Sequence, residues 1–289
     1  MSDRPEDRLL VRRTAKLFIG GEFPRSESGR TFEVRGADGE MLAHAARASR
    51  KDLRDAVKAA RGAQASWASR TAYNRGQILY RVAEMMEGRR TQFEDELADA
   101  GAGDPQREVS TSIDRWVWYA GWADKLAQVV GGTNPVAGPY FNFTVPEPTG
   151  VVGIVAPGEP PLLGLVSRLA PAIVGGNTAV VLAGERAALP AVSLGEVLAT
   201  SDVPGGVVNL LTGSSRELLP WLAGHMDVNA LDLTGCPPEL AADVEATAAE
   251  NVKRVHRAAA ADAFDPGAQS PYEITALLEL KTVWHPIGV

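Results

Sequence analysis

The chain has 289 residues, of which 45% are hydrophobic and 22% charged, so it can bury one large core or two small ones. Its net charge of -7, and the lack of a basic run with interleaved aromatic residues, argue against a nucleic-acid partner. Residues 1–14 alternate charges, and no apolar stretch approaches membrane-spanning length. We therefore expect a cytoplasmic protein with no membrane and no nucleic-acid partner.

The sequence predicts neither a disulfide nor a metal site. Cys236 is the only cysteine, so no intrachain disulfide can form. The four histidines share no spacing typical of metal ligands, and no cysteine and histidine pairing predicts zinc. Packing or surface roles are expected for these side chains.

The N-terminal segment predicts a small β element. Residues 16–23 are expected to form two short strands joined by a turn at Gly20-Gly21. Residues 32–47 repeat this pattern around Asp38-Gly39.

Helices are expected to follow. Ser49, three residues before Asp52, is typical of a helix cap, and Trp67 is expected to close this helix against the core. Three more helices are predicted at residues 74–88, 91–100 and 113–126. The last of them carries an aromatic cluster that we interpret as core packing, formed by Trp116, Trp118, Tyr119 and Trp122.

From residue 151 the chain alternates short apolar runs with single helices. The β-rich runs are Val151–Ala156, Thr178–Leu182, Gly206–Leu211 and Asn229–Thr234. The helical spans between them are residues 162–174, 189–200 and 216–225. Continuous apolar strands separated by helices predict a parallel sheet covered on both faces. The expected fold class is α/β, with a Rossmann-like sheet and flanking helices, and ligands are expected beyond the carboxyl ends of its strands.

The pattern changes after Thr234. Helical spacing of apolar residues predicts one helix over residues 237–257, and small residues with Pro266-Gly267 predict a linker at 258–271. Residues 274–284 alternate as a strand that has no neighbouring strand nearby in the sequence. We therefore expect this strand to pair with a sheet of another molecule. One of its faces is the predicted interface, formed by Leu278, Leu280, Thr282 and Trp284.

A series of segments carries a family resemblance. The segments are GVVGIVAP (150–157), LAPAIVGGNTAVVL (169–182), VPGGVVNLLTG (203–213) and LTG (233–235). In order and spacing they resemble the nucleotide-binding half of aldehyde dehydrogenases, and the C-terminal LLELKTVW resembles the family's oligomerisation strand. The resemblance implies a nucleotide-binding domain over residues 1–257, a linker at 258–271 in place of the catalytic domain, and a protruding oligomerisation arm at 272–289.

The resemblance also implies that the catalytic groups are missing. The asparagine of the family's oxyanion hole aligns with Glu159, whose carboxylate would repel the negative charge that an amide stabilises. The general-base glutamate falls near Ala258, and the catalytic cysteine has no counterpart. No catalytic residue is therefore assigned.

The cofactor positions are altered as well. The resemblance places Pro157, Glu185, Gly213, Gly235 and Cys236 at the family's dinucleotide site. Leucine replaces the ribose-binding lysine, and Cys236 replaces the pyrophosphate-binding serine with a weaker hydrogen-bonding group. NAD or NADP binding is therefore expected to be weak or lost. Cys236 is interpreted as an inert buried thiol, not a nucleophile.

Three functions follow as alternatives. The first is a non-catalytic subunit that forms a hetero-oligomer with a full-length aldehyde dehydrogenase, which the strand without a partner favours. The second is a residual NAD(P)-dependent aldehyde dehydrogenase, which the intact framework and Glu185 favour. The third is a regulator that binds a dinucleotide and reports it to a partner.

Overall fold

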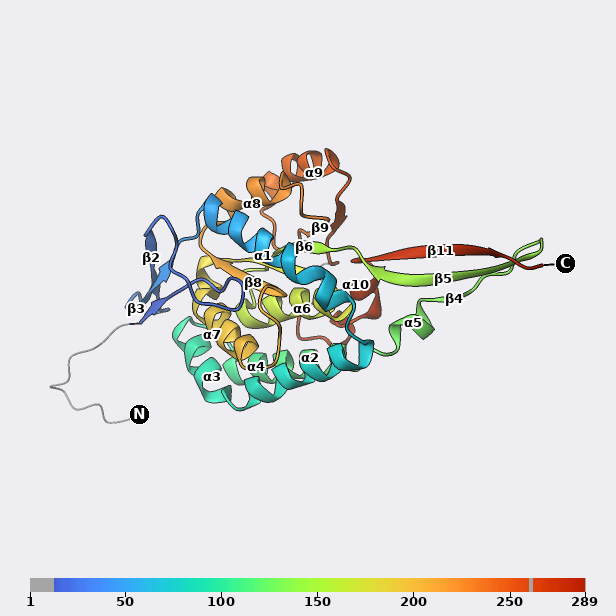
Figure 1. Cartoon of the computed structure of the whole chain (residues 1–289). Coiled ribbons are helices and arrows are strands. Elements are labelled where there is room, and N and C mark those ends of the chain that lie inside the picture. The colour runs from blue at the N-terminus through green and yellow to red at the C-terminus, as the bar shows by residue number, and fades with distance from the viewer. Residues whose placement is uncertain (1–12, 260–261, 289) are drawn as a thin grey trace.

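A computed structural model describes residues 13–259 and 262–288. Its centre is a five-stranded parallel sheet in the order β10-β9-β6-β7-β8, with helices on both faces (Figure 1). The strands are β6 (Val151–Val155), β7 (Thr178–Ala183), β8 (Val208–Thr212), β9 (Ala230–Asp232) and β10 (Arg254–His256). The expected α/β, Rossmann-like fold class is confirmed.

The helices largely follow the predicted spans. They are α1 (Arg50–Ala68), α2 (Ala72–Glu87), α3 (Arg90–Asp99), α4 (Pro105–Ala120), α5 (Leu126–Val129), α6 (Pro161–Val174), α7 (Ala188–Ala199), α8 (Ser215–Ala223), α9 (Ala241–Ala249) and α10 (Pro271–Thr275). Short 3-10 turns are η1 (Glu185–Ala187), η2 (Pro238–Leu240) and η3 (Pro266–Ala268). The fourth predicted helix begins earlier than expected, because Asp104 caps α4 by accepting the Arg107 N–H at 3.0 Å. It also ends earlier, at Ala120, where Gly121 is the C-cap.

Alternate residues of the inner strand β6 face different cores, which explains why this strand is apolar throughout. In β6, Val152 and Ile154 belong to the core that also contains the apolar faces of α6 and α7. Val151 and Val155 belong to the core beneath α1 and α8. The sheet is thus buried on both sides, and only its edges and strand ends remain for ligands or partners.

Two local predictions in the first half are confirmed. Ser49 caps α1 in a capping box, in which Ser49 Oγ accepts from Asp52 N–H at 3.3 Å and the Asp52 carboxylate accepts from Ser49 N–H at 2.7 Å. Trp116 and Tyr119 are fully buried, as expected of core packing.

The N-terminal β element is a small sheet in the order β1-β3-β2, formed by β1 (Thr14–Ala15), β2 (Thr31–Arg35) and β3 (Met41–Ala46). Residues 16–23 do not form two full strands. They make single bridges, Phe18 to Leu210 and Ile19 to Glu22, around the glycine turn. Phe18 pairs with Leu210 in the edge strand β8. This segment therefore extends the central sheet and does not form a separate hairpin.

The single helix predicted over residues 237–257 is wrong. The structure has η2 and α9, then a turn in which Val252 has a φ of +57°, then β10. β10 pairs in parallel with β9, in register Val255 to Leu231. Pairing with an exposed sheet edge satisfies backbone groups of residues 254–256, and this tertiary gain overrides the helical pattern.

The prediction that the C-terminal strand lacks a partner in its own chain is also wrong. β11 (Leu278–Pro286) pairs antiparallel with β5 (Tyr140–Pro148), and β4 (Gly132–Thr133) lies on the other side of β5. Sequence reasoning missed β5, the partner supplied from far away in the chain. The three strands project from the body (Figure 1), and we call them the arm.

Residues at the base of the arm attach it to the body. Leu278, a predicted interface residue, is 2% exposed and packs on Gly175, where an added Cβ would lie 2.6 Å from Leu278 Cδ2. Leu278 is therefore buried in its own subunit and is not available to a partner. Leu280, Thr282 and Trp284 are exposed further along the strand.

Candidate functional site

The loops after the parallel strands lie at one edge of the sheet, where open α/β folds bind ligands. Gly235, after β9, donates its N–H to the Val155 carbonyl at 3.0 Å. A Cβ at Gly235 would overlap the Ala156 carbonyl and lie 2.6 Å from the nitrogen of Pro157. Gly235 and Pro157, both predicted cofactor residues, are therefore brought together, and this position requires glycine.

Other predicted cofactor positions are spread along the same edge. Glu185 is exposed and opens η1 after β7. Gly213 follows β8 with a φ of +128°, a conformation that side-chain-bearing residues rarely adopt. Leu182, where the resemblance implies a ribose-binding lysine, is 1% exposed and has no donor to offer.

Two exposed ion pairs link these loops. Glu159 Oε1 lies 2.7 Å from Arg186 Nη1, which joins the loop after β6 to η1. Arg216 pairs with Glu239 and joins the start of α8 to η2. Exposed pairs contribute only about 0–1 kcal/mol to stability. The first pair has a chemical consequence. Glu159, which aligns with the family's oxyanion asparagine, is an ion-paired carboxylate, and an ionised carboxylate cannot donate a hydrogen bond.

Cys236 has the environment of a structural thiol. It is 8% exposed, and its Sγ lies 3.4 Å from the Pro237 carbonyl. Burial raises the pKa of the thiol, and the charge of Arg257 opposes this shift only in part. Since the thiolate is the nucleophile, this environment disfavours covalent catalysis at Cys236.

The first turn of α6 is already hydrogen bonded by the chain itself. Free N–H groups at a helix start next to a strand end commonly bind phosphate. Here Glu108 Oε1, from α4, accepts from Leu162 N–H at 2.8 Å and from Leu163 N–H at 3.1 Å. Burial raises the pKa of Glu108, and these two donors oppose the shift. An anion at this helix start would have to displace the Glu108 carboxylate.

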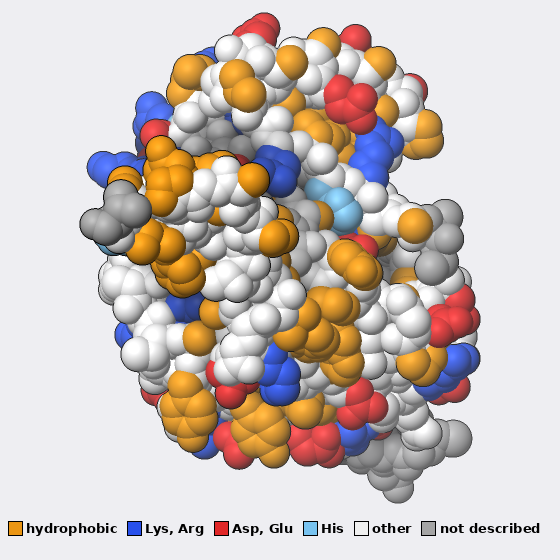
Figure 2. Space-filling view, turned by 90° about the vertical axis from the view of Figure 1, so that its right-hand side faces the viewer, with side chains coloured by type: hydrophobic (Ala, Val, Ile, Leu, Met, Phe, Trp, Pro, Cys, Tyr) orange, Lys and Arg blue, Asp and Glu red, His pale blue; other side chains and the backbone are white. Residues whose placement is uncertain are grey.

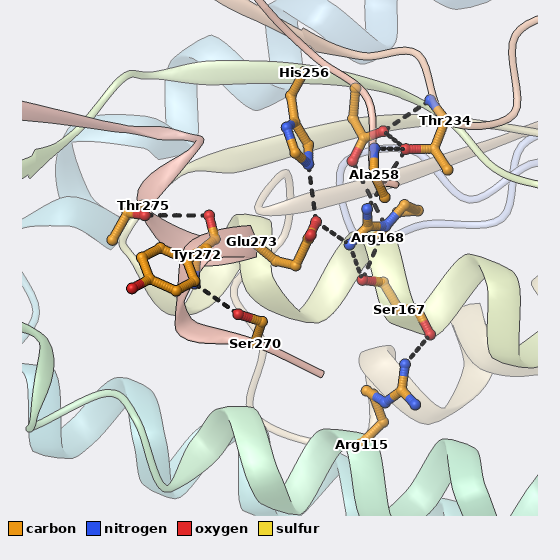
Figure 3. A network of polar contacts seen from close by, with 11 residues as sticks. Arg115, Ser167, Arg168, Thr234, His256, Ala258, Ser270, Tyr272, Glu273 and Thr275 are labelled. Carbon is orange, nitrogen blue, oxygen red and sulfur yellow. Dashed lines mark hydrogen bonds and ion pairs between the residues drawn. The ribbon is translucent and has the colours of Figure 1, made fainter. Parts of the chain in front are cut away.

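A buried ionic cluster joins α6, β9, β10 and α10 (Figure 3). Arg168 of α6 is 4% exposed, and its guanidinium lies 3.7 Å from the Asp232 carboxylate. Arg168 Nη2 donates to Glu273 Oε2 at 2.6 Å, and His256 Nε2 lies 2.8 Å from the same oxygen. The cluster therefore ties the short helix before the arm to the central sheet.

The charges of this cluster stabilise one another. Burial alone would raise the pKa of Glu273, but the His256 hydrogen bond and the Arg168 charge lower it to about 2. Burial also acts to lower the pKa of Arg168, yet Asp232 and Glu273 raise it overall. Sequence reasoning missed this cluster. The available signal was Arg168 itself, a charge in an otherwise apolar buried helix, which requires a partner.

The described part of the predicted linker packs on the body. Ala258 N–H donates to Thr234 Oγ1 at 3.0 Å, and the Ala263 carbonyl accepts from Arg115 at 2.9 Å. Beyond the predicted linker, two residues after α10 ends, the Leu277 carbonyl accepts from Asn177 Nδ2 at 2.9 Å. Ala258, the position aligned with the general base, thus contributes only a backbone N–H to these contacts.

The loops at the carboxyl ends of the strands keep two glycines that the resemblance assigns to the dinucleotide site, Gly213 and Gly235, but lack two of its polar side chains. Gly213 has a φ of +128°, and Gly235 packs so closely on the Ala156 carbonyl that a Cβ would overlap it. Leu182 and Cys236 stand where the resemblance implies lysine and serine donors. Within residues 13–259 and 262–288, no group of three or more His, Cys, Asp and Glu side chains is placed to bind a metal ion. Over the same ranges, no helix is long and apolar enough to cross a membrane.

Comparison with known proteins connects this architecture to a family. The family model described as aldehyde dehydrogenase family matches residues 23–262. The chain is 35% identical over 250 residues to the putative aldehyde dehydrogenase DhaS of Bacillus subtilis (strain 168), covering 84% of this chain and 50% of that protein. It is 34% identical over 260 residues to retinal dehydrogenase 2 of Homo sapiens, covering 87% and 49%. The chain thus spans about half the length of the curated relatives it matches.

Solved structures agree. HpcC from Thermus thermophilus matches with a TM-score of 0.80 and 33% identity, covering 85% of this chain and 48% of that chain. The NAD+ complex of an aldehyde dehydrogenase from Bacillus cereus matches with a TM-score of 0.77 and 28% identity, covering 84% and 50%. The parallel sheet and its flanking helices therefore have the architecture of an NAD-binding fold, and the chain belongs to the aldehyde dehydrogenase family.

Proposed function

We propose that this chain is a non-catalytic subunit that assembles with a full-length aldehyde dehydrogenase and supports or regulates it. The observation that carries the proposal is the open outer edge of β11. In the sheet order β11-β5-β4, β11 pairs on one side only within the described residues. An open strand edge presents unpaired backbone groups that a strand of a partner can complete.

The side chains of the arm support a partner of this kind. Leu280 is 52% exposed, Val283 40%, Trp284 58% and Ile287 51%. Figure 2, which looks along the arm, shows hydrophobic side chains gathered on it at the left of the view. Exposed apolar residues grouped on a projecting element mark an interaction surface, because water solvates such a patch poorly.

The site chemistry supports the absence of catalysis. Aldehyde oxidation through a thiohemiacetal needs a thiolate, an oxyanion donor and a base to activate water. The catalytic cysteine has no counterpart in this chain, and Cys236, its only cysteine, is a buried thiol at the position of the family's pyrophosphate-binding serine. The positions of the oxyanion donor and the base hold an ion-paired carboxylate and an alanine, which are Glu159 and Ala258. Any activity is therefore proposed to reside in the partner.

Co-expression with a full-length aldehyde dehydrogenase from the same organism tests the proposal. We expect a mixed oligomer by light scattering after size-exclusion chromatography. The double variant Leu280→Asp/Trp284→Asp, which places charges on the arm, should abolish it. Tyr73→Asp, at an aromatic residue that is 66% exposed on α2, is the matched control and should leave it intact. A homodimer that ignores the full-length enzyme, or equal assembly of all variants, would contradict the proposal.

A dinucleotide-binding regulator is the second candidate. The retained glycine geometry at Gly213 and Gly235 favours it, whereas Leu182 and Cys236 weaken it. Isothermal titration with NAD and with NADP separates the two candidates. We expect weak or undetectable heat, and tight binding of either dinucleotide would favour the regulator.

A further inference from the structure

We infer that a groove between α1 and α8 docks an acidic peptide segment of a partner protein. In this inference Arg50 and Arg54 receive its carboxylates, and an apolar side chain of the peptide rests on Trp221. The groove lies on the body, not on the arm, so the inference does not depend on the assembly proposed above.

The groove combines cations with an apolar floor. Its volume is about 470 Å³, and its lining includes Arg50, Leu53, Arg54, Trp221, His225 and Met226. Among the described residues, no carboxylate lines it. The chain as a whole has a net charge of -7, so this lining differs in sign from the overall charge. The local charge favours an anion.

Two arginines are held at the rim of the groove. Arg50 and Arg54 are one helical turn apart and therefore lie on the same face of α1. The Arg50 guanidinium carbon lies 3.7 Å from the centre of the Trp221 ring, which fixes both side chains without neutralising the arginine. Arg54 has a weak pair with Asp55 at 3.8 Å and keeps a side chain that is 65% exposed. Both guanidinium groups can therefore bind carboxylates.

The apolar floor is open to solvent. Trp221 is 46% exposed and Met226 is 71% exposed. Tryptophan, methionine and arginine are enriched in protein interfaces, and tryptophan with arginine commonly supplies most of the binding energy. Trp221, Met226 and two arginines lie together here, and this combination of residues is typical of the centre of a protein interface.

The shape of the region favours an extended chain over a small molecule. Pockets for small ligands bury most of the ligand surface, whereas Trp221 and Met226 remain open here. A second groove of about 480 Å³ adjoins the first, shares Arg50 and Arg54, and is also lined by Lys51 and Glu27. Lys51 has its own carboxylates, Glu27 at 3.9 Å and Asp55 at 3.7 Å. The anionic contacts of a bound segment are therefore centred on the two arginines.

The net charge of the chain predicts selectivity. A chain of charge -7 repels polyanions at long range, so binding depends on close contact with the groove and not on a broad basic field. An acidic peptide with an apolar residue satisfies both parts of the groove. A nucleic acid or an anionic membrane surface would match the positive charge of the arginines but would not supply an apolar side chain to contact Trp221.

Selection of short random peptides displayed on phage tests the inference on the full chain. The selection uses the wild-type protein and removes phage that bind the Arg54→Glu/Trp221→Ala variant. We expect enrichment of aspartate or glutamate flanking a leucine, phenylalanine or similar residue. No enrichment, or enrichment of peptides without acidic residues, overturns the inference.

Fluorescence anisotropy with the selected peptide then measures the contribution of each side chain. We expect affinity to fall roughly tenfold or more in Arg54→Glu and in Trp221→Ala. Matched controls on α2, Arg81→Glu and Tyr80→Ala, should bind like wild type. Arg54→Glu replaces an exposed residue, so it tests the groove even if Trp221→Ala misfolds. Equal loss in the control variants, or displacement of the peptide by single-stranded DNA or phosphatidylserine vesicles, overturns the inference.

Discussion

At the residue scale, Cys236 shows how one environment decides the chemistry of a side chain. The thiol follows a strand end, where α/β enzymes place reactive groups, but it is 8% exposed and burial raises its pKa. Its N–H donates to the Leu233 carbonyl at 3.0 Å, which fixes the local turn. The residue therefore has the properties of a packing group.

The reactivity of this thiol is directly measurable. In native protein, Cys236 should react with Ellman's reagent more slowly than in guanidinium chloride, because burial limits access to the thiol and raises its pKa, which reduces the thiolate fraction. Cys236→Ser should eliminate the signal and leave the fold unchanged by circular dichroism. Rapid modification of the native protein would show that the thiol is accessible and ionised.

At the element scale, α10 determines how the arm begins. Its Glu273 reaches Arg168 and His256, and its end places Leu278 on Gly175. This short segment gives Arg168 a second carboxylate partner besides Asp232. A buried cation destabilises the folded protein unless it is paired. By supplying Glu273, the helix that precedes the arm therefore also stabilises the body.

Removing the Glu273 charge should destabilise the protein. Breaking a buried ion pair costs about 3–5 kcal/mol, and Asp232 remains beside Arg168, so we expect Glu273→Gln to lower the free energy of unfolding by roughly 2–3 kcal/mol. Urea denaturation measures the change. Glu279→Gln removes an exposed partner of Arg254 and is the control, with an expected effect below about 1 kcal/mol. Equal effects in both variants would exclude a special role for the buried pair.

The pKa of Glu273 also predicts a dependence on pH. Its folded pKa of about 2 lies below its ordinary value of 4.5, so the stabilisation is complete above pH 4.5 and is lost as the pH falls toward 2. The shift corresponds to roughly 3 kcal/mol. Urea denaturation of wild type and Glu273→Gln at several pH values measures it. The difference between the two proteins should shrink as the solution is acidified, and a difference independent of pH would contradict the assignment.

At the scale of the whole molecule, the arm projects from a well-packed body (Figure 1), and the outer edge of β11 has no strand partner within the described residues. In the body, both faces of the central sheet are buried, because a core covers each face. The arm gains most from a partner, since its exposed side chains and open edge are otherwise in contact with water.

Partner binding should therefore appear as added stability. A partner that binds only the folded chain stabilises it by about 2.7 kcal/mol at a concentration of 100 times Kd. We expect the melting temperature of this chain to rise with the concentration of a full-length aldehyde dehydrogenase, as followed by a fluorescent label on Cys236→Ser/Ser66→Cys. Leu280→Asp/Trp284→Asp should eliminate the rise. An unchanged melting temperature at saturating enzyme would oppose the proposed assembly.

The sequence predicted the central sheet because its middle strands are buried on both faces and are therefore mostly apolar, as in Val151–Val155 and Thr178–Ala183. It also predicted the start of α1, because the contacts of Ser49 and Asp52 are local. It did not predict β10 or β5. Arg254–His256 and Tyr140–Pro148 are strands because they pair with segments far away in the chain, and no local pattern specifies that partner.

The sequence by itself determined the family, the α/β class and the identity of the side chains at each chemical position, since these depend on the order of residues and on local periodicity. Only the tertiary structure decided that the C-terminal strand pairs with β5, that Glu273 neutralises Arg168, and that two arginines and a tryptophan share one groove. The physical reason is that charge pairing, burial and strand pairing depend on distances in space, and in this chain those distances join residues more than a hundred positions apart.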